Sequence, residues 1–173
     1  MRPDGRLLQL NSYENRVHQI FLEDGSAVVT KFYRPRRWSD AQILEEHGFA
    51  LELAAAEVPV AAPRVLQWAT PAPGLYLHGQ PPTLVHWQAA DTLHRFSVTP
   101  RQAGREPELE QPDVLRRLGG FIGRLHAVGR RLPFVHRRRM DPALDATTAI
   151  ETVQGLDMLT LHEAAAWVDA AQR

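Results

Sequence analysis

The sequence contains no cysteine, a single lysine and only two asparagines, and it has no long uninterrupted apolar run. Without cysteine, disulfides and thiolate metal sites are excluded. No stretch of about 18 apolar residues is present, so we expect no membrane span, and the start lacks the apolar core of a signal peptide. The formal net charge is zero, so no overall field attracts the chain to nucleic acid. We therefore expect a cytoplasmic protein with no membrane or nucleic-acid partner.

The chain uses arginine at almost every basic position, with 19 arginines against one lysine, Lys31. Lysine carries a compact point charge on a thin stem, whereas arginine presents a wide planar fork. A lysine that is kept under this bias is a candidate functional residue. A stray surface lysine explains the composition equally well. With 173 residues, 44% of them hydrophobic, the chain suits one domain, or one domain and part of another.

Lys31 lies in the second strand of a predicted hairpin, in which residues 17–22 and 27–33 are strands joined by a turn at Asp24-Gly25. Side chains alternate along a strand, so Lys31 shares a face with Val29 and Tyr33. We expect its stem to be buried and its ammonium group to lie at a rim. A polar loop without glycine, residues 11–16, precedes the hairpin.

A helix is predicted over residues 39–56, where Ser39 and Gln42 form a capping box. At 100° per residue, Glu46 falls on the flank of the apolar stripe and faces the body of the protein. Glu45 and Glu52 fall on the opposite side of the helix, which we expect to face solvent.

The rest of the chain changes from strands to helices. Pro112 opens a strongly periodic helix that ends at Gly129. The order of elements predicts an α+β fold, with a small antiparallel sheet and one helix followed by an α-helical part. The remaining predictions are strands at 65–69 and 94–100, a loop or irregular insertion at 70–92 that includes a candidate strand at 75–77, a solvated basic loop at 130–139 and a helix at 156–171.

Lys31 and Glu46 together match a known chemical arrangement. A strand lysine and an inward-facing helix glutamate position nucleotide phosphates in kinases, where the glutamate orients the lysine. The loop at 11–16 lies where a kinase covers the phosphates. It lacks the G-x-G-x-x-G pattern, but its backbone amides and the Ser12 hydroxyl are suited to phosphate. The alternative is a structural surface ion pair, which is common in any α+β domain.

Several long segments make the resemblance specific: "LNSYENRV", "VVTKFYRPRRWSDAQILEEHGFALEL", "EVPVAAP" and "GRLHAVG". They resemble the bacterial stress-response serine/threonine kinases of the stress response kinase A type, which have the choline/aminoglycoside-kinase-like fold. The resemblance is close over 8–66 and fair over 95–136, and "FSVTPRQAGREPELE" is similar to the family's hinge segment.

The resemblance implies a set of site residues and cofactors. ATP would be bound by Ser12 in the loop, by Lys31 in the strand and by the hinge backbone near Val98 and Thr99. Glu46 would be the partner of Lys31. Mg²⁺ is expected for the family. The protein substrate is not indicated.

The sequence also departs from the family pattern. These kinases use a catalytic aspartate, a metal-binding asparagine five residues later and a second metal-binding aspartate. The two asparagines, Asn11 and Asn15, both lie in the first loop, and the family's His-Gly-Asp stretch is absent. No catalytic residue or metal ligand can therefore be assigned. We expect a truncated kinase that lacks the catalytic loop and is by itself inactive, with a kinase-like lobe at 1–100, a hinge at 101–111 and an incomplete helical lobe at 112–173.

Two other functions remain open from the sequence. The chain could be a non-catalytic module that binds a nucleotide or another protein, or an arginine-rich nucleic-acid binder that uses the loop at 130–139. The pairing of Lys31 with Glu46 favours the kinase and the non-catalytic module over the nucleic-acid binder. The missing catalytic residues favour the non-catalytic module for this chain taken alone.

Overall fold

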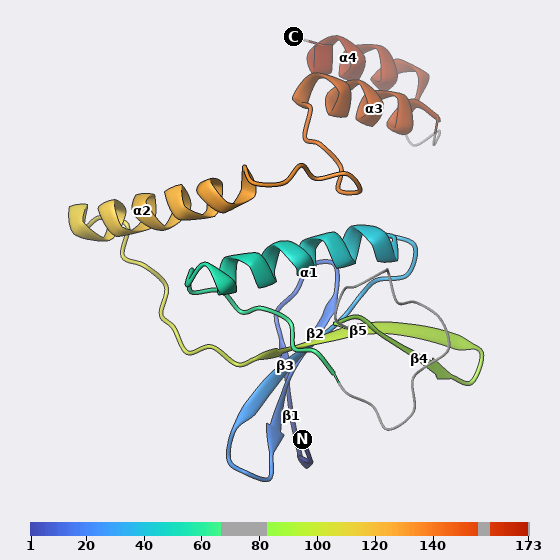
Figure 1. Cartoon of the computed structure of the whole chain (residues 1–173). Coiled ribbons are helices and arrows are strands. Elements are labelled where there is room, and N and C mark those ends of the chain that lie inside the picture. Colours follow the sequence, from blue (N-terminus) through green and yellow to red (C-terminus); the bar gives the residue numbers. More distant parts are fainter. Residues whose placement is uncertain (67–82, 156–159, 173) are drawn as a thin grey trace. The chain divides into compact units, whose positions relative to one another are not determined.

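Five antiparallel strands form a single sheet in the computed structural model, which describes residues 1–66, 83–155 and 160–172. The predicted hairpin is confirmed as β2 (Arg16–Leu22) and β3 (Ala27–Phe32). Gly25 has φ 80° in its turn, and Asp24 accepts a hydrogen bond from the Ser26 N–H. The strands lie in the order β1-β2-β3-β5-β4 (Figure 1). Their bounds are β1 Pro3–Leu10, β2 Arg16–Leu22, β3 Ala27–Phe32, β4 Val85–Ala89 and β5 Thr92–Pro100.

The two faces of this sheet have different roles. One face carries an apolar cluster whose buried members are Leu22, Val28, Leu66, Val85 and Val98. Because side chains alternate along β3 and β5, the other face carries Lys31 and Ser97, which are paired across the two strands. The site is built on this second face.

Helix α1 (Asp40–Ala55) covers the face that carries Lys31. Its predicted capping box is confirmed, since the Ser39 Oγ accepts from the Gln42 N–H and the Ser39 N–H donates to the Gln42 side chain. Asp40, in the first turn, pairs with Arg95 of β5 at 2.7 Å and with His86 of β4 at 3.0 Å. These contacts fix the start of α1 to the sheet.

Helix α2 (Pro112–Gly129) packs against the C-terminal half of α1. Pro112 lies in its first turn, as predicted. Leu53, Val58 and Val128 are buried between the two helices, with Phe49, Phe121 and Leu125 packed around them. The fold therefore holds α1 from two sides, by the sheet along its start and by α2 near its end.

The chain divides into two compact units, Met1–Arg137 and Arg138–Arg173. The second contains helices α3 (Pro142–Gly155) and α4 (Leu161–Gln172), which contact each other. Asp141 caps α3, because its carboxylate accepts from the Leu144 N–H at 3.2 Å. Among the helices of the described segments, none is long and apolar enough to cross a membrane.

Three sequence predictions need correction. The strand predicted at 65–69 is wrong at residues 65–66, which form no strand, and the rest lies outside the described residues. The loop predicted at 70–92 contains a strand, β4, that pairs with β5. The candidate strand at 75–77 lies outside the described residues. The third correction is a helix that was not predicted, α3, which begins after Asp141 at Pro142. The helix predicted at 156–171 is formed as α4 from Leu161, and residues 156–159 lie outside the described residues.

Candidate functional site

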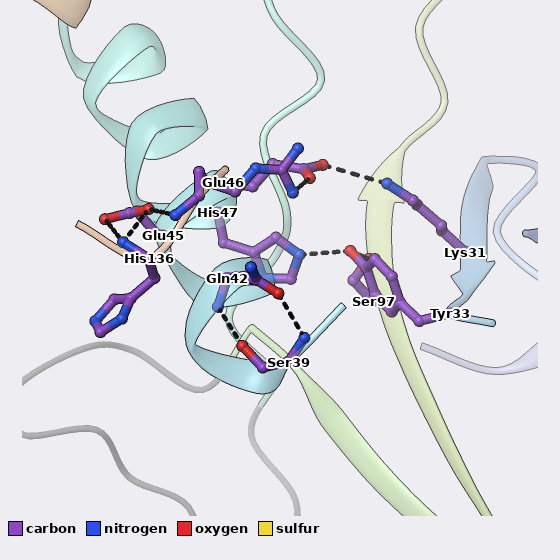
Figure 2. Close-up of polar contacts among 10 residues, drawn as sticks. Lys31, Tyr33, Ser39, Gln42, Glu45, Glu46, His47, Ser97 and His136 are labelled. Atoms are coloured by element: carbon purple, nitrogen blue, oxygen red, sulfur yellow. Dashed lines mark hydrogen bonds and ion pairs between the residues drawn. The ribbon is translucent and has the colours of Figure 1, made fainter. Parts of the chain in front are cut away.

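The predicted pair of Lys31 and Glu46 is formed. The Lys31 Nζ lies 3.2 Å from the Glu46 Oε1, across the gap between β3 and α1 (Figure 2). The Lys31 ammonium also lies 4.9 Å from the centre of the Tyr33 ring. About a third of the Lys31 side chain (34%) and 40% of the Glu46 side chain remain exposed. An ion pair this exposed adds at most about 1 kcal/mol to stability, so stability alone is a weak reason for the one lysine to lie here.

Glu46 also has a second basic partner, which sequence reasoning missed. Its Oε2 lies 3.0 Å from the Arg137 Nη1. The Arg137 guanidinium lies over the Trp38 ring, 4.3 Å from its centre. The basic loop at 130–139 was predicted to be solvated, and for Arg137 this is wrong, because it is half-buried against α1.

Glu45 is a second correction, since it was predicted to face solvent. Its two carboxylate oxygens accept hydrogen bonds from three consecutive backbone N–H groups, those of Val135, His136 and Arg137, at 2.6 to 3.1 Å (Figure 2 labels Glu45 and His136). Desolvation tends to raise the pKa of Glu45, but these donors outweigh it and lower the pKa below its usual value. The segment after α2 is therefore fastened to α1 beside the Lys31–Glu46 pair.

A chain of buried polar groups lies behind this pair. The Tyr33 hydroxyl is 2.7 Å from the His47 Nε2 and 3.2 Å from the Ser97 Oγ (Figure 2). The His47 Nδ1 is 2.8 Å from the Thr83 Oγ1. All four residues are less than 9% exposed. Each of these four side chains has a hydrogen-bond partner, as buried polar groups require.

Burial keeps both ring residues of this chain uncharged. Desolvation lowers the pKa of His47 to about 4, although the nearby Glu46 carboxylate opposes the shift. Desolvation likewise raises the pKa of Tyr33 to about 12. A neutral imidazole has one donor and one acceptor nitrogen, so it fits between the Tyr33 and Thr83 hydroxyls. The network joins Tyr33, directly after β3, to β5 and α1, and it adds no charge beside Lys31.

The polar loop before β2 is tied to the segment that leads into α1. The Glu14 carboxylate pairs with Arg37 at 2.7 Å, and the Asn15 side chain accepts from the Arg34 N–H at 3.2 Å. The Ser12 Oγ accepts from the Asn15 N–H at 3.3 Å. Because a hydroxyl can accept and donate at once, this bond leaves the Ser12 proton available for another acceptor.

The two predicted hinge residues, Val98 and Thr99, lie at the end of β5. The Val98 carbonyl accepts from the Arg64 N–H at 2.7 Å, and Thr99 pairs with Val29 of β3. The Val98 side chain belongs to the apolar cluster on the far face. A carbonyl oxygen has two lone pairs, so this bond leaves the Val98 carbonyl one further acceptor site.

The comparisons with known proteins agree with this architecture. The model of the phosphotransferase enzyme family matches residues 6–173. This chain belongs to that family. It is 44% identical over 137 residues to stress response kinase A of Escherichia coli K12, and 45% identical over 134 residues to the serine/threonine protein kinase RdoA of Salmonella typhimurium. The resemblance found in the sequence is confirmed.

The matches cover most of this chain but a smaller part of the relatives. The aligned residues make up 79% of this chain and 37% of the Escherichia coli kinase, and 78% and 36% for RdoA. The chain therefore spans just over a third of the length of these relatives.

Solved structures agree on the fold at low sequence identity. The amicoumacin kinase hAmiN, in complex with AMP-PNP, Ca²⁺ and Ami, has a TM-score of 0.60 at 19% identity, and it covers 92% of this chain and 51% of that one. A microcompartment-associated aminopropanol kinase has a TM-score of 0.54 at 19% identity, and it covers 88% and 51%. The predicted fold, a kinase-like N-terminal lobe with helices following it, is confirmed.

The magnesium expected for the family has no ligand set among the residues that the structure describes. No three histidine, aspartate or glutamate side chains there come together as a metal site. Both asparagines lie in the loop before β2. These residues do not fit a catalytic magnesium, so we assign none of them to the metal.

Proposed function

We propose that this chain is the nucleotide-binding portion of an ATP-dependent serine/threonine protein kinase of the stress-response type. The observation that supports this most is the 3.2 Å pair between Lys31 and Glu46, formed by a strand and a helix of a kinase-like lobe. In this proposal Lys31 binds the α and β phosphates of ATP, and Glu46 holds Lys31 in place. The proposed domains are the lobe at 1–100, the hinge at 101–111 and the incomplete helical lobe at 112–173.

The loop before β2 supplies the second part of the proposed phosphate site. Ser12 keeps a hydroxyl proton that can be donated to a phosphate oxygen, and the links of Glu14 and Asn15 to the 34–37 segment hold the loop near the start of α1. The adenine would lie at the hinge near Val98 and Thr99. The Val98 carbonyl bonds the Arg64 N–H with one lone pair and keeps a second lone pair for the adenine amino group.

The chemical class of the acceptor is inferred from the names of related kinases. The name of the relative at 45% identity, serine/threonine protein kinase RdoA, favours a protein hydroxyl. The solved structures at 19% identity are kinases named for small molecules. We weigh the closer relatives more and propose serine or threonine hydroxyls.

A second candidate function is a non-catalytic module that binds a nucleotide or a protein. It is favoured by the lack of asparagine after residue 15 and by the lack of a metal-ligand cluster among the described residues. Both candidates share the proposed nucleotide site, and only the kinase requires transfer of phosphate.

Calorimetry of the chain with ATP tests the site that both candidates share. We expect weak binding, with a Kd on the order of 100 μM to 1 mM, little changed by Mg²⁺ and strongly reduced by Lys31→Ala. The matched control is Arg116→Ala, which removes one exposed positive charge from α2, in the same unit but away from the proposed site. Equal ATP binding by wild type and Lys31→Ala would refute the proposed site. An arginine-rich nucleic-acid binder would instead bind RNA or DNA with an affinity that falls steeply with salt.

A further inference from the structure

Glu46 holds two cations that come from distant parts of the chain. Its Oε1 pairs with Lys31 at 3.2 Å and its Oε2 with Arg137 at 3.0 Å. Each oxygen has its own partner, so the carboxylate cannot rotate without weakening one of the two pairs. Arg137 therefore determines the orientation in which Glu46 meets Lys31.

Arg137 is in turn fixed from two other directions. Its guanidinium lies over the Trp38 ring at 4.3 Å, and its backbone N–H donates to the Glu45 Oε2 at 2.6 Å. Within 131–140 it is the one residue that is not exposed. Neighbouring glutamates of α1 thus hold the backbone and the side chain of the same residue. A guanidinium held in this way has already lost its rotamer freedom, so it constrains Glu46 at a reduced entropic cost.

We propose that Arg137 is a positioning residue of the phosphate site, which holds Glu46 in the orientation that presents Lys31 to a nucleotide. This inference rests on the proposed function of Lys31. Arg137 acts through Glu46, and the nucleotide contacts Lys31. The geometry of the site then depends on a residue 91 positions from Glu46, so the docking of the segment after α2 and the state of Lys31 are coupled.

The single lysine allows a direct test that requires no nucleotide. With lysine labelled at ¹³Cε, the NMR spectrum of the full chain contains one lysine side-chain signal, that of Lys31. We expect the signal of Arg137→Ala to move toward the position found in Glu46→Gln. Arg137→Gln, which keeps an N–H donor for Glu46, should move it less. The control Arg139→Ala removes an exposed arginine two positions away and should leave the signal unchanged.

An unchanged Lys31 signal in both Arg137 variants would overturn the proposal, whether or not the chain binds ATP. A shift of the Lys31 signal in Arg139→Ala as large as that in Arg137→Ala would also overturn the proposal, because it would show an effect of lost charge alone. The NMR result is therefore independent of the proposed function.

ATP calorimetry then separates positioning from direct contact. We expect Arg137→Ala to weaken ATP binding about threefold when Lys31 is present, the scale of one exposed ion pair, and to have no effect in the Lys31→Ala background. Equal weakening in both backgrounds would mean that Arg137 contacts the phosphates itself or supports the fold, and it would overturn the positioning role. If wild type binds no ATP, the proposed function fails, and the lysine signal still decides whether Arg137 orients the pair.

Discussion

Replacing His47 with glutamine should make the stability of the fold less sensitive to mild acid. His47 is 4% exposed, and desolvation lowers its pKa from 6.5 to about 4. Between these values the unfolded chain binds a proton that the folded chain excludes, so stability falls as the pH drops from about 6.5 to 4. Below about pH 4 both states are protonated, and this residue adds no further loss.

The size of the effect follows from the two pKa values. The full shift corresponds to about 3 kcal/mol, and the part lost between pH 7 and pH 5 is about 2 kcal/mol. Glutamine can retain hydrogen bonds to Tyr33 and Thr83 but does not titrate. We therefore expect His47→Gln to be less stable than wild type at pH 7, yet to lose about 2 kcal/mol less on going to pH 5.

Urea unfolding at pH 7, 6 and 5, followed by circular dichroism, measures this difference. The control is His94→Gln, which removes an exposed histidine of β5 and should keep the pH dependence of wild type. If wild type and His47→Gln lose the same free energy between pH 7 and pH 5, His47 is not held neutral by burial. The hydrogen-bonded network of Ser97, Tyr33, His47 and Thr83 would then need another explanation.

Two further predictions concern the contacts that anchor α1 to the sheet and the transfer of phosphate from ATP. Asp40→Ala should destabilise the fold by about 2 kcal/mol or more in urea unfolding, because it leaves the half-buried Arg95 without a carboxylate. Asp113→Ala, which breaks the exposed pair with Arg116 in the first turn of α2, should cost less than about 0.5 kcal/mol; similar losses in the two variants would contradict the anchoring role. This chain alone should transfer no phosphate above background from radiolabelled ATP to a general protein substrate. Robust labelling that Lys31→Ala abolishes would show that the chain holds catalytic groups that we have not identified.

The parts of the fold that local patterns determine could be predicted from the sequence. The β2–β3 hairpin follows from an Asp24-Gly25 turn between two strand-forming segments. The start of α1 follows from the Ser39–Gln42 capping box. The contact of Lys31 with Glu46 followed from combining strand alternation with helix phase. Each of these signals lies within a few residues of the feature that it predicts.

The missed features depend on contacts between distant residues. Helix phase correctly turns Glu45 away from the sheet, but no local pattern indicates that the segment after α2 returns to cover that side, 90 positions later. Arg137 was missed for the same reason. Strand β4 is short, lies at the sheet edge and leaves Trp87 half-exposed, so it lacks a clear apolar alternation. Helix α3 did have a signal, in Asp141-Pro142, that was not used.

The variant Lys31→Arg tests whether Lys31 binds phosphate as a point charge oriented by Glu46. This variant keeps the positive charge and the ion pair with Glu46, but it replaces the compact ammonium with a wide fork. Calorimetry with ATP at constant salt compares wild type, Lys31→Arg and Lys31→Ala. We expect Lys31→Arg to bind ATP clearly more weakly than wild type. Binding by Lys31→Arg that equals wild type would contradict it, because the one lysine would then serve only as a positive charge.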